Sequence, residues 1–403
     1  MTMRPFTSTI SIDEAHAIIE AGVSPIDRTE SVPLADARGR VLARDVVARF
    51  DVPPFDRASM DGYAVVAADT AGATREQGRR LELIGRLYTG DVPTVTVTPG
   101  SCVEIATGAP IPLGADAVIM VEETAQQGSD VELFTSVRPR QNIGPRGADI
   151  AVGDTVLRAG QVLNASRIGA LAALGCADAE VWVRPSVAIL STGNEIAELG
   201  RPLAPGQIYD INRYTLAAVV AEHGGAATAI STARDTVEAL HQAIDNCLGH
   251  DLIVFSGGSS VGERDLILDV IRERGEVRFH GIAVKPGKPT LFGMLGGRPV
   301  FGMPGYPTSC LSNAYILLVP ALRRMARLPS SAPRRLTMPL AARVTSVAGR
   351  HQFYSVRVED GHAVPAFKAS GDITSISRAD GYIEIAMDVT VVEAGTAVVV
   401  TLV

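Results

Sequence analysis

Between residues 181 and 328, short apolar runs alternate with longer segments of helical spacing. The run Leu252–Phe255 is typical of these apolar pieces, and it has the length and character of a buried strand in a parallel sheet. Strands and helices that alternate in this way predict a three-layer α/β domain with a mostly parallel sheet. The expected strands are 186–190, 228–230, 252–255, 290–294 and 300–303, and the expected helices are 213–223, 237–248, 265–274 and a long one that ends at Arg327.

The segments on either side of this domain follow other patterns. A capping box of Ser11 and Glu14 predicts a helix that ends near Gly22. Residues 81–137 are strand-like and rich in turn residues, which indicates a small β domain. After the linker-like stretch 329–333, Val and Ile alternate with polar residues, which indicates a separate β domain.

The composition limits the classes of function and the cellular setting that are expected for this chain. The 403 residues include 37 Lys and Arg against 44 Asp and Glu, a net charge of −7, which argues against a nucleic-acid or anionic-membrane surface. No apolar run approaches membrane-spanning length and the first residues lack a signal-peptide pattern, so a soluble, cytoplasmic protein is expected. The four cysteines have no CxxC spacing and are expected to be reduced and mostly buried; they are Cys102, Cys176, Cys247 and Cys310.

The stretch from Asp251 to Asp265 combines features of an anion site and a cation site. Gly257 and Gly258 would let the backbone approach a phosphate-like ligand, and the following helix start would supply N–H donors. Carboxylates in the same turn, such as that of Asp265, would fit a bridging Mg²⁺, which prefers oxygen ligands. A tight turn whose acidic residues only favour the helix N-terminus is the alternative.

Three loops follow the ends of expected strands, at 191–195, 256–265 and 304–309. Because ligands of such sheets bind at the carboxyl ends of the strands, the three loops together favour a binding site there. The turn that contains Lys285 and Lys288 would add two point charges for an anion, although a solvated turn is the alternative.

Eight short motifs occur in a fixed order across essentially the whole chain. They are Ser59-Met-Asp-Gly-Tyr-Ala64, Thr107-Gly-Ala-Pro110, Arg146-Gly-Ala-Asp149, Ser191-Thr-Gly-Asn-Glu195, Tyr209-Asp-Ile-Asn212, Ser256-Gly-Gly with Gly262-Glu-Arg-Asp265, Lys285-Pro-Gly-Lys-Pro289, and Pro304-Gly with Pro307-Thr-Ser309. Each motif is weak alone, but the ordered set resembles the molybdopterin molybdenumtransferase family, called MoeA in bacteria and the E domain of gephyrin in animals. Ser259, Ala148 and Tyr306 depart from that family's usual Val, Glu and Asn, so a paralogue, including one that handles tungstate, is an alternative.

The resemblance implies an enzyme of molybdenum cofactor biosynthesis. Such an enzyme inserts its substrate molybdate into adenylylated molybdopterin with release of AMP and requires Mg²⁺. A non-catalytic scaffold or assembly protein of the same family and a metal-dependent nucleotide hydrolase remain alternatives. The resemblance further implies a homodimer whose active site lies between one subunit's α/β domain and the other's β domain, with other cofactor-biosynthesis proteins as further partners.

The same resemblance implies four structural parts. These are an elongated dimerisation region (1–44 and 146–180), an inserted β domain (45–145), the α/β molybdopterin-binding domain (181–328) and a C-terminal β-barrel domain (329–403).

The site residues that the resemblance implies form three overlapping groups. The expected catalytic residues are Asp61, Thr107, Asp149, Glu195, Asp210 and Asp265, of which Glu195 and Asp265 would bind Mg²⁺. The residues expected to bind substrate or anion are Ser191, Gly193, Gly257, Gly258, Gly262, Lys285, Lys288, Pro304, Gly305 and Ser309. Ser309 is also expected to cap the last helix of the α/β domain.

Overall fold

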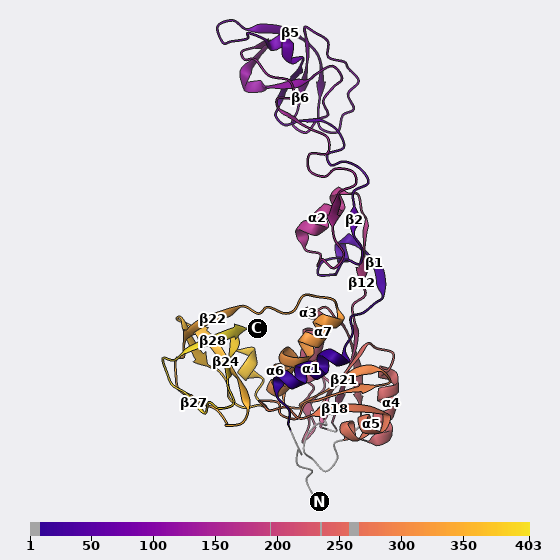
Figure 1. The fold of residues 1–403 in the computed structure, drawn as a ribbon, viewed down its shortest axis with the longest axis vertical. Helices are drawn as coiled ribbons and strands as arrows, with labels where there is room; N and C mark the ends of the chain where they lie inside the picture. The colour runs from indigo at the N-terminus through magenta and orange to yellow at the C-terminus, as the bar shows by residue number, and fades with distance from the viewer. Residues whose placement is uncertain (1–8, 194, 234–235, 258–265) are drawn as a thin grey trace, which may run out of the picture. The chain divides into compact units, whose positions relative to one another are not determined.

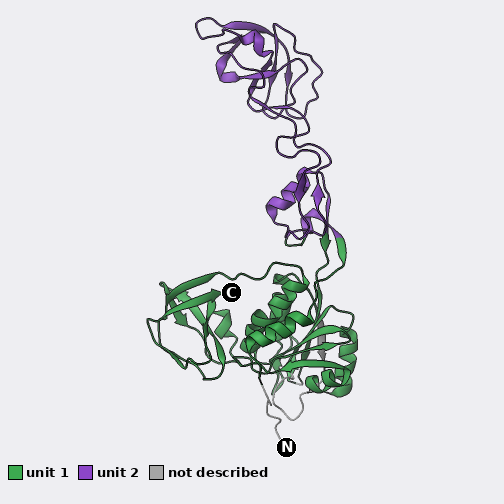
Figure 2. Cartoon of the chain, viewed as in Figure 1, with its two compact units in different colours: residues 1–30, 39–41, 181–403 green, residues 31–38, 42–180 purple. Residues whose placement is uncertain are grey.

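The computed structural model describes residues 9–193, 195–233, 236–257 and 266–403, and these form two compact units (Figures 1 and 2). Unit 1 comprises Met1–Glu30, Gly39–Val41 and Val181–Val403, and unit 2 comprises Ser31–Arg38 and Leu42–Glu180. Each unit has hydrophobic cores of its own. The division into four parts with the boundaries given above stays a prediction.

A six-stranded sheet in the order β16-β13-β17-β21-β20-β18 forms the centre of unit 1. Its strands are β13 (Ser186–Thr192), β16 (Ala226–Ala233), β17 (Leu252–Ser256), β18 (Gly275–His280), β20 (Leu291–Leu295) and β21 (Arg298–Met303). The first four strands in that order are parallel; β20 is antiparallel to both of its neighbours, β21 and β18, so β18 runs in the direction of the first four. The mostly parallel sheet is therefore confirmed, whereas β18 was missed because Glu276 and Arg278 break its apolar pattern.

Helices cover both faces of this sheet (Figure 1). Successive residues of β17 enter opposite cores, because side chains alternate along a strand: Val254 packs on one face and Phe255 on the other. The core around Val254 includes residues of α1 (Ile12–Gly22), α3 (Asn212–Glu222), α6 (Pro307–Asn313) and α7 (Val319–Met325), and the core around Phe255 includes residues of α4 (Val237–Cys247) and α5 (Leu266–Arg274). The three-layer arrangement is confirmed.

The N-terminal helix α1 has the capping box that the sequence predicts. The Ser11 hydroxyl accepts the Glu14 N–H, and the Glu14 carboxylate accepts the Ser11 N–H at 2.9 Å. The helix ends at Gly22, as expected.

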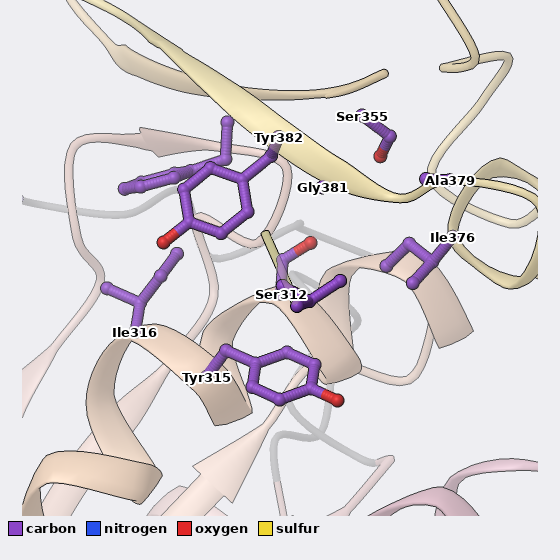
Figure 3. Close-up of a pocket in the computed structure, with 10 residues that line it drawn as sticks. Ser312, Tyr315, Ile316, Ser355, Ile376, Ala379, Gly381 and Tyr382 are labelled. Carbon is purple, nitrogen blue, oxygen red and sulfur yellow. The ribbon is translucent and has the colours of Figure 1, made fainter. Parts of the chain in front are cut away.

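The helix predicted to run to Arg327 changes its winding halfway. Between α6 and α7, residues Ala314–Leu318 form a π-helical turn. Pro320 follows this turn, and because it has no N–H it cannot donate to the carbonyl of Ile316 as a regular α-helix would require. Tyr315 and Ile316 of the turn line a small cavity, and Tyr382 of β26 (Gly381–Ile385) lines it from the C-terminal segment (Figure 3).

The C-terminal segment forms β structure with its own core, as predicted. Its sheet follows the order β19-β24-β26-β28-β22, with β25 paired to β24. The strands are β19 (Val284–Lys285), β22 (Arg335–Pro339), β24 (His351–Glu359), β25 (His362–Pro365), β26 (Gly381–Ile385) and β28 (Ala397–Leu402), and β23 (Val344–Thr345) pairs separately with β27 (Val391–Val392). Strand β19 belongs to the turn of the α/β domain that contains Lys285. Because β19 pairs with β24, this turn is hydrogen-bonded to the C-terminal sheet.

Unit 2 contains another six-stranded sheet, in the order β7-β4-β6-β5-β9-β8. Its strands are β4 (Gly62–Val65), β5 (Arg79–Leu87), β6 (Ser101–Ile105), β7 (Ala117–Met120), β8 (Thr124–Gln127) and β9 (Asp130–Leu133), which confirms the β domain expected over 81–137. The rest of the unit includes α2 (Ala165–Ala173) and the short strand pairs β2 (Val46–Val47) with β11 (Thr155–Leu157) and β3 (Arg57–Ala58) with β10 (Ile143–Gly144).

All four cysteines are free thiols, as expected, and three of them are buried. Burial raises the pKa of Cys102 to about 12 and that of Cys247 to about 11, so neither thiol ionises near neutral pH. Among the helices of the described residues, none has the length and apolar character needed to cross a membrane.

A buried carboxylate ties the start of the unit 1 sheet to the N-terminal segment. Asp251 is 6% exposed and accepts hydrogen bonds from the Ser186 N–H at 2.9 Å, the Ser186 hydroxyl at 2.7 Å and Arg28 Nη2 at 2.7 Å. Burial alone would raise the pKa of Asp251, but the hydrogen bonds from Ser186 and Arg28 outweigh it and hold the pKa below its ordinary value. The ionised carboxylate therefore stabilises the fold.

Asp251→Asn should lower the free energy of unfolding by about 2 kcal/mol near neutral pH, because charge-assisted hydrogen bonds are lost. Since the pKa is lower in the folded state, this stabilisation is present above the unfolded-state pKa of about 4 and is lost as the pH falls through the folded-state value. Urea unfolding of both proteins from about pH 7 to about pH 3 measures the difference. A difference that stays constant over this range would contradict the assignment.

Candidate functional site

The carboxyl ends of β13, β17 and β21 meet at one edge of the unit 1 sheet, as predicted. The Gly257 N–H donates to the Met303 carbonyl at 3.4 Å. Gly257 has a φ of +90°, and a Cβ added there would lie 2.5 Å from the Thr192 carbonyl oxygen, so no larger residue fits. A Cβ on Gly305 would meet the Gly257 Cα at 3.6 Å. The loops that follow the three strands are therefore in direct contact.

The start of α3 lies at the same edge. The Asn212 side chain donates through Nδ2 to the Gly305 carbonyl at 2.8 Å. Asp210, which is 4% exposed, accepts the Arg213 N–H through Oδ1 at 3.0 Å and so pairs with a free N–H of the first turn of α3. Burial, and to a smaller extent the charge of Asp210, raises the pKa of the Cys310 thiol to about 12, which places Asp210 near α6 as well.

Polar atoms that lack a hydrogen-bond partner within the described part of the chain gather at this edge. They are Ser191 Oγ, Thr192 Oγ1, Asp210 Oδ2, Asn212 Oδ1 and Arg213 Nε. A buried polar group left unpaired costs about 1–3 kcal/mol, so a folded protein seldom keeps several of them close together without a ligand. This group of atoms makes the edge a candidate site for a polar ligand.

Glu195 lies just after β13. Gly193 has a φ of +145°, and a Cβ there would lie 2.6 Å from Glu195 Oε1, so the carboxylate is folded back over the glycine. Glu195 is exposed. Its expected partner Asp265, together with Gly258 and Gly262, lies outside the described residues. Within the described ranges no three His, Cys, Asp or Glu side chains form a metal-binding group, so the Mg²⁺ ligand pair stays a prediction.

The turn that carries Lys285 and Lys288 is held by a buried asparagine. Asn313 of α6 donates through Nδ2 to the Gly287 carbonyl at 2.7 Å and to Thr290 Oγ1 at 2.5 Å. Both lysines are partly buried, which differs from a freely solvated turn. Asn313 was missed by the sequence analysis, because its role depends on contacts with a turn that is distant in the chain.

The predicted capping role of Ser309 is wrong. Helix α6 begins at Pro307, and its N-cap, Tyr306, makes no side-chain capping bond. Proline is favoured at the first helical position, because its φ is already helical and its missing N–H costs nothing there. Ser309 is instead the third residue of the helix and is 3% exposed. Its contact with a phosphate, like those of Pro304 and Gly305 with substrate, stays a prediction.

In unit 2 the structure brings together two of the predicted catalytic residues, which are far apart in the sequence. Asp61 Oδ1 accepts the Thr107 N–H at 2.6 Å and the Thr107 hydroxyl at 2.9 Å. These two bonds lower the pKa of Asp61, so its carboxylate is ionised near neutral pH. Asp149 is exposed, and no hydrogen bond or ion pair found in the described segments joins its side chain to this pair.

Three family models match successive parts of the chain. Residues 10–175 match the model of the MoeA N-terminal region (domains I and II), residues 188–324 match a probable molybdopterin binding domain, and residues 337–403 match the MoeA C-terminal region (domain IV). Molybdopterin molybdenumtransferase 2 of Mycobacterium tuberculosis is 36% identical over 95% of this chain and 97% of its own length. A molybdopterin molybdenumtransferase of a Nostoc species is 34% identical over 81% and 77%.

A solved structure agrees with these sequence matches. The crystal structure of a molybdopterin biosynthesis MoeA protein from Pyrococcus horikoshii has a TM-score of 0.84 and 39% sequence identity, and the match covers 98% of this chain and 99% of that one.

Proposed function

The chain belongs to the molybdopterin molybdenumtransferase family, and from this we propose that it inserts molybdate into adenylylated molybdopterin and releases AMP. The observation that supports this reaction most is the group of unpaired buried polar atoms at the edge of the unit 1 sheet. It lies in the part of the chain that matches the molybdopterin-binding model.

The described residues suit a substrate that carries phosphates and a dianionic oxyanion. Lys285 and Lys288 supply positive charge, and the hydroxyls of Ser191 and Thr192 can donate to phosphate oxygens. In unit 2, the ionised Asp61 with the Thr107 hydroxyl would orient substrate through hydrogen bonds. The site thus supplies donors for the anions and acceptors for substrate hydroxyl and amino groups.

A divalent cation would find oxygen donors among the residues of this edge. Glu195 and the unpaired Oδ2 of Asp210 are oxygen ligands of the kind that Mg²⁺ prefers, and Asp265 would complete the set. Mg²⁺ bound there would neutralise charge on the phosphate oxygens as the phosphoanhydride bond breaks. We further propose that the protein is a homodimer and that its C-terminal sheet closes into a barrel, as the family resemblance implies.

Purified protein given adenylylated molybdopterin, molybdate and Mg²⁺ should form a cofactor that activates an apo-molybdoenzyme. AMP release without any activation would instead favour the nucleotide hydrolase. Absence of both products would favour the scaffold. Tungstate in place of molybdate tests the paralogue, because a tungstate-specific enzyme would release AMP faster with that oxyanion.

Lys285→Gln or Lys288→Gln should weaken molybdate binding by about tenfold at low salt and by less at high salt, because salt screens the lost charge. Equilibrium binding across a salt series measures this. Arg298→Gln is the matched control, since it removes one exposed positive charge at the opposite end of β21. Equal affinities for the control and the two lysine variants would show that the lysines belong to a solvated turn and do not bind the anion.

A further inference from the structure

The guanidinium of Arg213 lies at the N-terminus of α3, beside the proposed substrate site, and is held from two sides. Its Nη2 donates to the Tyr214 hydroxyl at 3.1 Å, and its Cζ lies 5.0 Å from the centre of the Tyr214 ring. On the other side, Nε lies 3.6 Å from Asp210 Oδ2, which is beyond hydrogen-bond distance. The side chain is only 13% exposed, so it is fixed rather than freely solvated.

This fixed guanidinium keeps an unused donor. Arg213 Nε is buried and has no hydrogen-bond partner in the described residues, although Asp210 is close enough to stabilise its charge. Two hydroxyls at the same edge, those of Ser191 and Thr192, are also buried and unpaired, and their residues are 2% and 5% exposed. The N-terminus of α3 adds backbone N–H groups and a positive dipole end. All of these groups suit a phosphate.

We propose that Arg213 is a substrate-positioning residue, which donates from Nε to a phosphate oxygen of the nucleotide-bearing substrate. The inference rests on the proposed function and adds to it the group that recognises the phosphate. Asp210 and Tyr214 hold the guanidinium in place, and the planar arrangement of its N–H groups matches a phosphate better than an ammonium would.

A purely structural role for Arg213 makes a different prediction. If the side chain only stabilised α3 through Asp210 and Tyr214, its loss would affect every ligand of the site equally, through a change in folding. A phosphate contact affects only ligands that carry the phosphate. AMP and adenosine differ by that group alone, so they are the probes that separate the two roles.

Calorimetric binding of AMP and adenosine to the full-length wild type, Arg213→Gln and Arg213→Lys tests the inference. Arg213→Gln should weaken AMP binding by about tenfold to hundredfold and leave adenosine binding within about twofold. The AMP affinity of Arg213→Lys should lie between those of the wild type and Arg213→Gln, because the charge remains but the Nε geometry is lost. Arg298→Gln is the control: it removes one exposed positive charge at the opposite end of β21 and should leave AMP binding within about twofold.

Three outcomes would overturn the inference. Unchanged AMP affinity in Arg213→Gln shows that the phosphate lies elsewhere, and an equal loss for AMP and adenosine shows a structural role; either result leaves the proposed function standing. Absence of AMP binding to the wild type would contradict both the inference and its premise. Melting temperatures of the variants show whether each is folded, and Arg213→Lys provides the test if Arg213→Gln does not fold.

Discussion

Asp210→Asn should lower turnover by at least about 100-fold without unfolding the protein. Asn keeps an Oδ1 that can accept the Arg213 N–H, so the bond to the first turn of α3 remains. What it removes is the negative charge on Oδ2, the buried oxygen without a hydrogen-bond partner in the described residues. Steady-state AMP release by the purified variant measures the loss, and thermal unfolding measures the effect on the fold.

Asp380→Asn is the matched control for this change. Asp380 also accepts a backbone N–H, from Val358 at 2.7 Å, but it lies immediately before β26. The two variants should have similar melting temperatures and very different activities. Turnover of Asp210→Asn within about threefold of the control would show that Asp210 is not a catalytic residue.

The layers of the fold could be read from the sequence because the central strands of the unit 1 sheet, β13, β17 and β21, bury both faces. Val254 and Phe255 enter different cores, so β17 appears in the sequence as one continuous apolar run. Strand β18 carries charged residues and lies at the edge of the sheet, where no continuous apolar run is required. The π-helical turn before Pro320 was missed because a helix pattern contains no information on local winding.

The sequence predicted those parts of the candidate site in which a motif directly follows the end of a strand. Ser191, Gly257 and Gly305 follow strand ends, and the sheet topology alone brings their loops together. Asn313 and Arg213 could not be found in this way, because their roles depend on contacts between segments distant in the chain or on an unpaired buried atom. The pair of Asp61 and Thr107 came from the family resemblance, and the structure adds the hydrogen bonds that join them.

Co-expressed Asp61→Asn and Asp210→Asn should recover about one quarter of wild-type activity as an unseparated mixture and about one half as purified mixed dimer, although each variant alone is nearly inactive. In the proposed homodimer, a site that takes Asp61 from one subunit and Asp210 from the other is intact once in every mixed dimer. Random pairing makes about half of the dimers mixed, and each of these has one intact site of two. Differently tagged variants, co-expressed and purified through both tags, provide the mixed dimer directly.

Co-expression of two differently tagged copies of Asp61→Asn is the control, because it forms dimers with no intact site. If both residues served the same subunit's site, the mixed dimer would be as inactive as this control. That result would contradict the shared site, while the assignment of each residue to catalysis would remain.

Release of AMP should be coupled to insertion of molybdenum, and a single-turnover experiment measures this coupling. Protein in excess over adenylylated molybdopterin is mixed with Mg²⁺ and molybdate, and both the AMP released and the molybdenum bound to the pterin are measured over time. We expect the two to appear in equimolar amounts, and chelation of Mg²⁺ to stop both. Full release of AMP with no molybdenum on the pterin, at saturating molybdate, would contradict the proposed function.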